Sequence, residues 1–372
     1  MATTMDMTPQ RETPLIAEHR TLQAKLAPFG GWLMPIQYEG ILAEHHWTRN
    51  NVCVFDICHM GEFQVQGDLA SSNLDHVVTI NLTGMATGQC RYGFMLNQAG
   101  GVIDDLVVYR LGEKEWMLVV NAATEENDEH HLLRNLSRDI TFKNISGQTG
   151  KLDVQGPLSG VILKDLVGAD VAKLAYYTFA KFKLLGEDVI VSRTGYTGEL
   201  GYEIYISSAK VVELWRLLLK NSRVKPAGLG ARDTLRLEMG YPLYGQDLDT
   251  QTTPVEAGLS GFVDFSKDFI GKLSLVAQKD GGPSRRLRCF QSDSRRAPRH
   301  NYKIYLKDKE IGAVTSGSFS PTLGCGIAMG YVSCELKTGE QVNLKENQID
   351  IPARVVTRPF YKQGTAKSEE IR

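Results

Sequence analysis

Hydrophobic and polar positions alternate over several short segments of the chain, and this period of two predicts β-strands. In residues 60–66, Phe63 and Val65 face one way while Glu62 and Gln64 face the other. This pattern is typical of a strand with one face on a core and one face in solvent. We therefore expect a half-exposed strand here.

Two further groups of alternating segments are separated by turn residues. The first group predicts three consecutive antiparallel strands at residues 91–96, 102–111 and 115–121. The second predicts a hairpin with strands at residues 188–193 and 202–207 around the glycine-rich turn 194–201. The 36 glycines of the 372-residue chain agree with many tight turns between short strands.

Apolar residues at helical spacing lie between these strands. They predict helices at residues 18–26, 41–50, 123–136, 210–220 and 229–239, and another within 152–166 after the Gly156-Pro157 break. The segment 28–32 is interpreted as a turn and close-packing signal rather than as a regular element. Strands and helices mixed without a βαβ rhythm favour an α+β fold.

The composition changes to a linker near residues 280–284, and short β-rich segments follow as far as Phe360. These segments predict a separate C-terminal antiparallel barrel or sandwich. We divide the chain into residues 1–280, with two α+β lobes, residues 283–362, and a polar tail at 363–372. The tail is expected to fray.

Charge and cysteine content narrow the class of protein. The 42 basic and 43 acidic side chains leave a net charge of −1, which gives no overall attraction to nucleic acid or anionic lipid. No apolar run reaches the length that spans a bilayer, and the first 14 residues resemble no targeting segment. The six cysteines are too sparse for a disulfide scaffold. We therefore expect a soluble, cytoplasmic protein that binds neither nucleic acid nor membrane.

Two adjacent carboxylates interrupt the apolar strand at 102–109. Alternation places Asp104 on the face of Val102 and Leu106, and Asp105 on the opposite face with Val107. At least one carboxylate must then point towards an apolar interior, which is costly without a cation or a ligand donor. Asp105 is the stronger candidate for function, and Asp104 could equally bond the backbone of the preceding turn.

A second candidate carboxylate follows the glycine-rich turn. Glu203 could accept two parallel hydrogen bonds from a flat heteroaromatic ring, with Tyr196 covering one face of that ring. The alternative is a salt bridge from Glu203 to an arginine. Arg232 and Arg236 lie one helical turn apart after Gly228 and Gly230. We favour a binding role for Arg232 over a merely exposed ion pair, because glycines let a ligand approach the helix backbone.

Other chemistries lack their motifs. Cys53, Cys58 and His59 are not followed by a second pair at zinc-site spacing, so no metal site is predicted. Gly228-x-Gly230 lacks the third glycine of a dinucleotide fingerprint. The chain also has no phosphate-binding loop of the Walker type and no G-x-S-x-G nucleophile motif.

Longer blocks of residues resemble one family in their identity and order. They include Phe29-Gly30-Gly31-Trp32, His59-Met60-Gly61-Glu62, Asp104-Asp105-Leu106, Gln155-Gly156-Pro157, Thr194-Gly195-Tyr196-Thr197-Gly198-Glu199, Arg232-Asp233-Thr234-Leu235-Arg236 and Ser320-Pro321-Thr322. The chain resembles the T-protein family, the aminomethyltransferases of the glycine cleavage system, from about residue 13 to 361. The resemblance implies an α+β fold of three lobes in a cloverleaf, two of them mixed α/β lobes with antiparallel sheets and the third a C-terminal antiparallel β-barrel.

The resemblance also implies tetrahydrofolate as co-substrate in a central channel. It assigns Glu203 and Arg232 to the pterin ring, and Tyr196 and Asn121 to its slot. Further positions carried over are Met60 and Tyr92 along the passage and Tyr361 and Lys362 near the glutamate tail.

The reaction implied moves a one-carbon unit from an aminomethyl group on the lipoyl arm of H-protein to tetrahydrofolate, releasing ammonia. In this account Asp105 orients the folate amine and accepts or relays its proton, inside a channel that excludes competing water. Three positions depart from the family pattern, namely Cys58, Asp153 and Asn301. We expect none of the three to contact a site residue that the resemblance assigns. Asparagine at 301 is expected to be tolerated if its φ is positive.

Two other classes of function remain open from the sequence. A related folate-dependent demethylase would keep the folate-binding residues but act on a small methylated donor. A lobe of a sarcosine-type oxidase would likewise keep these residues and use a different donor. A non-enzymatic folate-binding module would carry a Lys-Gly-Cys-Tyr type of motif, which this chain lacks. The predicted partner is lipoylated H-protein, and the predicted state is a monomer or a weak dimer.

Overall fold

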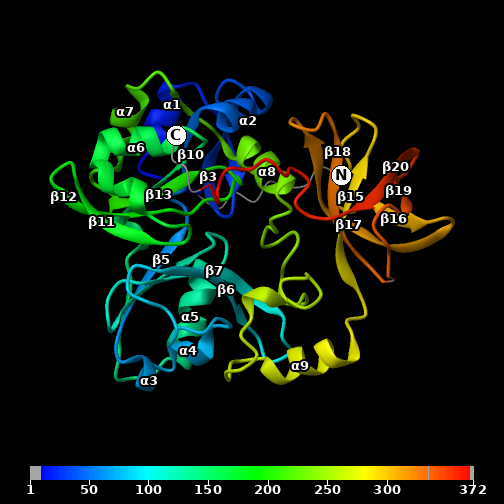
Figure 1. The fold of residues 1–372 in the computed structure, drawn as a ribbon, viewed down its shortest axis with the longest axis horizontal. Coiled ribbons are helices and arrows are strands. Elements are labelled where there is room, and N and C mark those ends of the chain that lie inside the picture. Colours follow the sequence, from blue (N-terminus) through cyan, green and yellow to red (C-terminus); the bar gives the residue numbers. More distant parts are fainter. Residues whose placement is uncertain (1–9, 334, 369–372) are drawn as a thin grey trace.

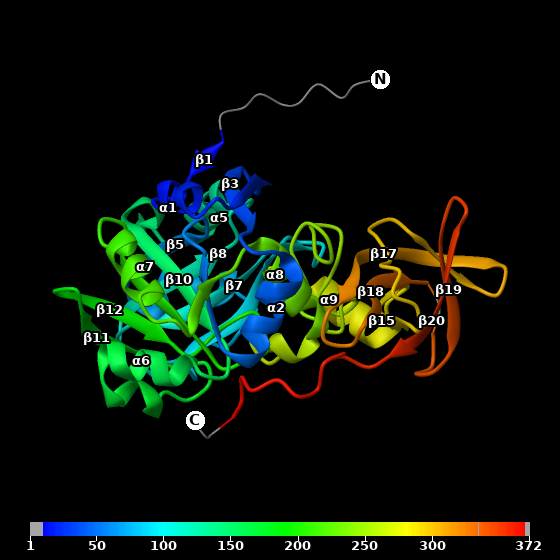
Figure 2. The same cartoon turned by 90° about the horizontal axis from the view of Figure 1, so that it is seen from above.

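A computed structural model describes residues 10–333 and 335–368, and it divides into three lobes around a common centre (Figure 1). Two lobes are built on sheets flanked by helices, one wholly antiparallel and one with a single parallel pair, and the third is a closed barrel. The α+β cloverleaf with a C-terminal antiparallel barrel is therefore confirmed. Figure 2 shows the barrel to one side of the other two lobes.

The chain begins with a small three-stranded sheet. Its elements are β1 (Arg11–Glu12), α1 (Ile16–Thr21), β2 (Lys25–Phe29) and β3 (Trp32–Gln37). The prediction of a helix over 18–26 was wrong at its end, because β2 starts at Lys25 and pairs with β3. The turn predicted within 28–32 is confirmed at Gly30 and Gly31, which have positive φ and join β2 to β3. Pro28, Phe29 and Trp32 belong to the two strands rather than to an irregular segment.

One lobe has a six-stranded sheet in the order β11-β12-β13-β10-β4-β14. Its strands are β4 (Val52–Asp56), β10 (Thr149–Gln155), β11 (Phe179–Leu184), β12 (Glu187–Ser192), β13 (Gly201–Ser207) and β14 (Val224–Pro226). Helices α6 (Ser159–Val167) and α7 (Val211–Leu219) pack on it, together with the short η2 (Ala169–Lys173). The predicted hairpin around 194–201 is the β12–β13 pair.

A second lobe has a five-stranded sheet in the order β6-β7-β8-β5-β9. Its strands are β5 (Gly61–Gln66), β6 (Cys90–Leu96), β7 (Val102–Arg110), β8 (Glu115–Val120) and β9 (Thr141–Asn144). Its helices are α3 (Leu69–Ser72), α4 (Leu74–Val77), α5 (Glu125–Asn135) and η1 (Ser146–Gln148). The three predicted antiparallel strands are confirmed as β6, β7 and β8. Strand β5 is less exposed than predicted, because Glu62 is buried.

The barrel closes in the order β15-β18-β17-β16-β19-β20. Its strands are β15 (Arg286–Ser292), β16 (Lys303–Leu306), β17 (Lys309–Ser320), β18 (Cys325–Val332), β19 (Gln341–Glu346) and β20 (Ile349–Val356). The β-rich pattern left a barrel and a sandwich open, and closure of the sheet decides for the barrel. Asn301, in the loop before β16, has a φ of +70°, so asparagine occupies a left-handed position as expected.

The remaining helices join the lobes. These are α2 (Ile41–Asn50), α8 (Leu229–Glu238), η3 (Ser260–Phe262) and α9 (Lys272–Gly281). Helix α8 packs against α2 on one side and against β17 of the barrel on the other. It therefore sits where the parts of the molecule meet.

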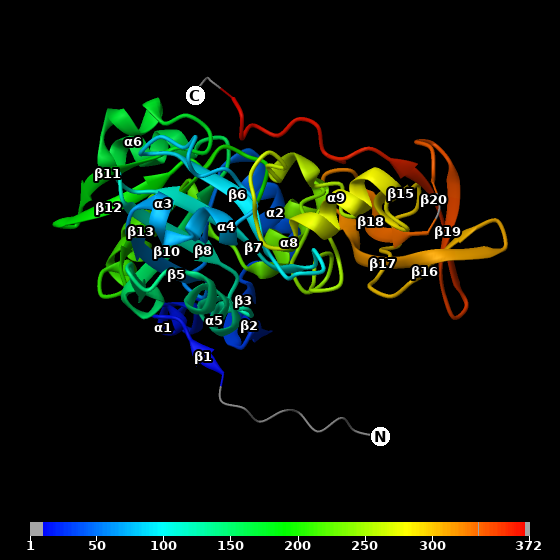
Figure 3. The same ribbon diagram turned by 90° about the horizontal axis from the view of Figure 1, so that it is seen from below.

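The chain after β20 leaves the barrel and runs back over the lobe that contains the six-stranded sheet, as Figure 3 shows. Thr365 donates to Glu199 at 2.6 Å and accepts from the backbone of Leu200 at 2.8 Å. The prediction that the tail frays was therefore wrong for residues 363–368, since these hydrogen bonds fix it. Residues 369–372 lie outside the described part of the chain. Among the helices described, none is both long enough and apolar enough to cross a membrane.

Candidate functional site

A cavity of about 1080 Å³ lies where the lobes meet. Its wall is drawn from β6, β7, the glycine-rich turn before β13, the segment after α8, η3 and the chain after β20. Seven of the described residues that line it are aromatic: Tyr92, Tyr176, Tyr177, Tyr196, Tyr241, Phe262 and Tyr361. Such a wall suits a large, flat organic ligand.

Asp105 is the carboxylate that faces this cavity. Its Oδ2 accepts a hydrogen bond from the Tyr92 hydroxyl at 2.8 Å, and its Oδ1 accepts one from the Asn121 amide at 2.8 Å. Burial raises the pKa of Asp105 above its usual range, and the two hydrogen bonds oppose that rise. The site therefore holds a carboxylate in a fixed orientation with a strengthened affinity for a proton.

Asp104 points to the other face of β7 and is fully buried. It accepts hydrogen bonds from the backbone N–H and the side-chain amide of Asn121, both at 2.9 Å. Burial and the neighbouring Asp105 charge raise the pKa of Asp104 to about 7. The alternation along β7 thus assigns Asp105 to the cavity and Asp104 to the interior behind it.

Asn121 follows β8 and joins the two carboxylates. Its amide nitrogen donates to Asp104 and Asp105, and also to the Asp105 carbonyl at 3.1 Å. The resemblance assigned Asn121 to the wall of a pterin slot. Among the described residues that line the cavity Asn121 is not included, and its contacts place it behind Asp105 as a clamp.

Tyr196 lines the cavity from the glycine-rich turn. Its ring stacks on Tyr241 with centroids 5.7 Å apart, and its hydroxyl donates to the carbonyl of Pro242. The turn needs glycine at 195, because a Cβ there would lie 2.2 Å from the Gln155 side chain. Close approach of the turn to β10 therefore fixes the tyrosine ring at the cavity wall.

Tyr361 and Lys362 line the same cavity from the chain after β20. The Arg49 guanidinium lies over the Tyr361 ring at 4.2 Å, and the Tyr361 backbone N–H donates to the Glu238 carbonyl at 2.9 Å. Lys362 is exposed. The structure therefore brings Tyr92, Asp105, Tyr196, Tyr361 and Lys362 together around one space.

Glu203 lies beside this cavity rather than among its described lining residues. Its carboxylate is 3.0 Å from the Lys151 ammonium and accepts a hydrogen bond from Tyr205 at 2.9 Å. Burial acts to raise the pKa of Glu203, but Lys151, Tyr205 and Arg232 together outweigh it and the pKa is lowered. Met60 contacts Lys151 through its sulfur at 3.6 Å and packs against the apolar cluster that contains the cavity-lining Cys90.

Arg232, on α8, forms an ion pair with Asp153 at 2.6 Å, and its guanidinium lies 5.0 Å from the Tyr196 ring centre. Asp153 is fully buried and is the cross-strand partner of Glu203. The expectation that Asp153 touches no residue carried over was therefore wrong. Burial raises the pKa of Asp153 to about 7, and the Arg232 charge opposes the rise.

The sequence analysis missed Lys151, which is 1% exposed and compensates the Glu203 charge. A signal was present in β10, where Lys151, Asp153 and Gln155 alternate with Leu152 and Val154. Polar residues on one face of a strand in the middle of a sheet must meet partners there. That face of β10 carries the ionic cluster beside the cavity.

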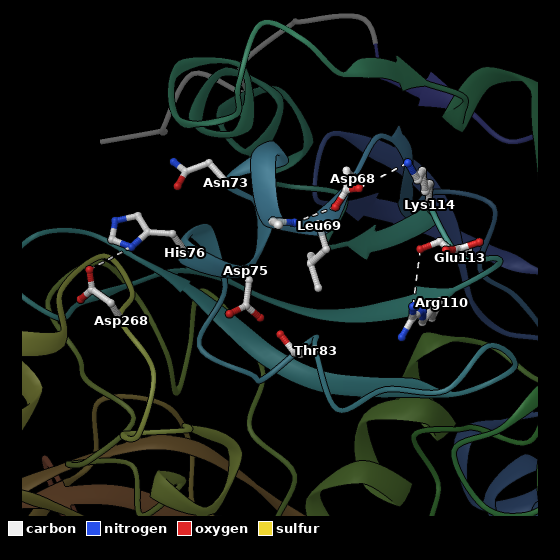
Figure 4. Close-up of a pocket in the computed structure, with 11 residues that line it drawn as sticks. Asp68, Leu69, Asn73, Asp75, His76, Thr83, Arg110, Glu113, Lys114 and Asp268 are labelled. Carbon is white, nitrogen blue, oxygen red and sulfur yellow. Dashed lines mark hydrogen bonds and ion pairs between the residues drawn. The ribbon is translucent and has the colours of Figure 1, made fainter.

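A second hollow, of about 550 Å³, opens on the surface of the five-stranded lobe (Figure 4). Four of its charged or titratable side chains form two pairs. Asp68 meets Lys114 at 3.3 Å, and His76 meets Asp268 at 3.4 Å. Arg110 donates to the backbone carbonyls of Met85 and Glu113.

Family models match both parts of the chain. The GCVT N-terminal domain matches residues 15–267, and the glycine cleavage T-protein C-terminal barrel domain matches residues 285–362. The described fold agrees with this division, since the barrel strands start at Arg286.

Similar proteins extend over nearly the whole chain. An aminomethyltransferase of Pseudothermotoga lettingae is 45% identical over 362 residues, which is 96% of this chain and 99% of that protein. One of Halothermothrix orenii is 44% identical over 94% of this chain and 99% of that protein. The crystal structure of glycine cleavage system aminomethyltransferase T from Bartonella henselae superposes with a TM-score of 0.91 at 32% identity, covering 96% and 99% of the two chains.

Proposed function

The chain belongs to the glycine cleavage T-protein family, and we propose that its central cavity holds tetrahydrofolate with Asp105 beside the reactive amine. Its activity is that of an aminomethyltransferase of the glycine cleavage system, and tetrahydrofolate is its co-substrate. The family acts together with H-protein. The resemblance to a demethylase of small donors is the weaker alternative, because the family models and relatives are those of glycine cleavage.

The reaction moves a one-carbon unit from an aminomethyl group, bound through sulfur to a lipoyl arm, to tetrahydrofolate. Its products are 5,10-methylenetetrahydrofolate, ammonia and the dihydrolipoyl protein. Tetrahydrofolate supplies the nucleophilic nitrogen. The protein has to orient that nitrogen, take up a proton and keep water away from the carbon in transit.

The cavity fits such a ligand in its volume and its lining. Its 1080 Å³ is at the upper end of the range for small-molecule sites. The stacked rings of Tyr196 and Tyr241 provide a flat aromatic surface. Asp105 supplies an acceptor on the wall, with Tyr92 and Asn121 bonded to it.

The observation that carries the proposal is the fixed Asp105 carboxylate in this aromatic cavity. Both of its oxygens accept from neutral donors, so its negative charge is not compensated by a salt bridge in the described residues. In a site screened from water, that charge stabilises a positive centre and draws a proton from an adjacent amine. We assign Asp105 as the catalytic residue.

The pterin would be held by Glu203 and Arg232, with Tyr196 against its face. Two contacts support this assignment. The Arg232 guanidinium lies over the Tyr196 ring, and Arg232 also forms an ion pair with Asp153, the residue opposite Glu203 on the neighbouring strand. The remaining binding residues in the proposal are Tyr92, Asn121 and Met60 near the pterin, and Tyr361 and Lys362 towards the glutamate tail. In this proposal Asn121 does not contact the pterin directly but holds the Asp105 carboxylate in place.

Lipoylated H-protein is the proposed donor partner, with its arm reaching the central cavity. We also propose the cytoplasm as the location and a monomer or weak dimer as the state. The division into a folate-binding region at 1–280, a barrel at 283–362 and a tail at 363–372 belongs to the same proposal.

The experiment combines the purified protein, H-protein carrying the aminomethyl lipoyl group, and tetrahydrofolate. Ammonia release and formation of 5,10-methylenetetrahydrofolate are measured with each component omitted in turn. Release that requires all three supports the proposal. Equal turnover with a free dimethylated sulfur donor in place of H-protein would reject the donor assignment.

A further inference from the structure

A third acidic residue, Asp128, lies behind the carboxylates of β7 and has no role in the mechanism above. It is on α5 and is fully buried. Neither of its oxygens meets a donor at good hydrogen-bond geometry among residues 10–333 and 335–368. The neighbouring Thr124 hydroxyl acts to lower the pKa of Asp128, but it donates to the Asn121 carbonyl at 3.1 Å. Its neighbour is the Asp104 carboxyl group.

The three carboxyl groups form a row that begins at the cavity. Asp105 faces the cavity, Asn121 bridges Asp105 and Asp104, and Asp128 is in contact with Asp104. Asn121 donates to Asp104 twice, through its backbone and its side chain. The orientation of the amide that holds Asp105 therefore depends on how Asp104 is held.

The other charged groups around Asp128 do not neutralise it. The Asp128 charge contributes to raising the pKa of Tyr244, from the chain after α8. His131, one helical turn along α5, has its pKa lowered by burial, which favours its neutral form. On the adjoining α4, Asp75 and His76 pair with Lys267 and Asp268. On α5 itself, Glu125 pairs with Arg11.

Two buried carboxyl groups can share a hydrogen bond only when one of them carries a proton. Two negative charges side by side without a cation would repel strongly in this interior. Carboxyl pairs of this kind therefore titrate together and retain one proton near neutral pH.

We propose that Asp128 is a positioning residue that keeps its proton and donates it to Asp104, so that Asp104 holds Asn121 and Asn121 holds the catalytic Asp105. This proposal rests on the role of Asp105 given above. In this proposal Asp105, at the cavity, is ionised, and Asp128, the innermost of the three residues, is a neutral acid. Burial and the Asp104 charge agree with it, because they raise the pKa of Asp128 to about 10.

The first test is the infrared spectrum of the full-length protein at neutral pH without substrate. Burial also raises the pKa of Glu62 to about 8 and those of Asp104 and Asp153 to about 7, so several groups contribute to the carbonyl stretch of neutral carboxylic acids. We therefore expect the difference spectrum, wild type minus Asp128→Asn, to show the loss of one such component. An Asp139→Asn variant, which changes an exposed aspartate, should show no such difference. A difference spectrum of Asp128→Asn without a lost neutral-acid component would overturn the proposal.

The second test compares two substitutions at 128. Asparagine keeps the shape and an N–H donor for Asp104, so Asp128→Asn should retain kcat within about threefold at neutral pH. Leucine removes the donor, so Asp128→Leu should lose at least about tenfold in kcat, with the folate KM changed less. Equal losses in the two variants would contradict the positioning role.

The two tests also separate this inference from the function on which it rests. If aminomethyl transfer were wrong, the wild type would show no turnover while the infrared difference remained. If Asp128→Leu does not fold, the spectrum of the wild type and of Asp128→Asn still decides whether the proton is present.

Discussion

Asp105 illustrates how the site fixes a charge with neutral groups. Tyr92 and Asn121 hold both carboxylate oxygens without removing the negative charge. A salt bridge would hold the side chain equally well, but it would compensate the charge that the reaction needs. The buried ion pairs, Lys151 with Glu203 and Arg232 with Asp153, lie instead beside the cavity.

Replacing the carboxylate tests its catalytic role directly. Asp105→Asn keeps the shape and loses the charge, so we expect nearly normal folate binding and a loss of at least about 10²-fold in turnover. Turnover is measured by ammonia release and binding by titration. Asp170→Asn, at an exposed ion pair with Lys173, is the control. Wild-type turnover in Asp105→Asn would remove Asp105 from the mechanism.

Glu203 is expected to affect both binding and stability, because it compensates the buried Lys151. Glu203→Gln should weaken tetrahydrofolate binding at least about tenfold, and should also lower the free energy of unfolding by about 1–3 kcal/mol. The paired variant Glu203→Gln with Lys151→Met removes both charges and should recover stability without recovering affinity. An unchanged dissociation constant in Glu203→Gln would reject its assignment to the pterin.

Among the elements, the chain after β20 has the least regular structure and yet completes the cavity. It contributes Tyr361 and Lys362 to the wall and is tied to the turn before β13 through Thr365. Because the same turn carries Tyr196, the tail and the aromatic wall support each other. A segment without helix or strand is ordered here by side-chain hydrogen bonds to buried partners.

The contribution of this tail can be measured at one hydroxyl group. Thr365→Val removes the donor to Glu199 and the acceptor for the Leu200 N–H, and should cost about 1–3 kcal/mol in unfolding free energy. Thr365→Ser keeps the hydroxyl and should cost less. Both are compared by urea unfolding. Identical midpoints for the two variants would show that the hydroxyl does not hold the tail.

In the whole molecule, one buried carboxylate connects the lobes. Glu238, at the end of α8, forms an ion pair with Arg49 of α2 at 2.8 Å. It also accepts hydrogen bonds from Ser320 at 2.5 Å and from the Thr322 backbone at 3.0 Å, both in the barrel region. Burial acts to raise the pKa of Glu238, but His45, Arg49 and Ser320 lower it to about 2.

The lowered pKa gives a stability that depends on pH. Glu238 in the unfolded chain takes up a proton near pH 4.5, whereas in the folded protein it does so only near pH 2. Its contribution is present above about pH 4.5 and is lost as the pH falls towards 2, by roughly 3 kcal/mol. Urea midpoints measured from pH 6 to pH 3 should fall accordingly.

The control for this titration is Glu238→Gln. It should be less stable at neutral pH by about 3 kcal/mol, since Arg49 loses one of its two buried carboxylate partners and keeps Glu199 at 2.8 Å. Its free energy of unfolding should also fall less on acidification than that of the wild type. The buried His59, whose pKa burial lowers to about 4, titrates in both proteins and cancels in the comparison. Parallel pH curves for the two proteins would contradict the role of Glu238.

The local elements and the candidate acids could be predicted from the sequence. Alternation in residues 102–109 predicted a strand with one carboxylate on each face, because side-chain direction in a strand follows from covalent geometry. The glycine-rich turn and the composition change near 280–284 likewise predicted a hairpin and a separate β-rich part. The family blocks predicted folate chemistry, and they needed no knowledge of which strands pair.

Which groups meet depends on the packing of distant segments. The six-stranded sheet pairs β10 with β13, strands that are far apart along the chain, so no local pattern places Lys151 against Glu203. The same holds for Asp153 with Arg232 and for the row from Asp105 to Asp128. Ionisation and orientation in a buried site depend on neighbours brought together by long-range packing, and a sequence pattern reports only the side chain's own strand or helix.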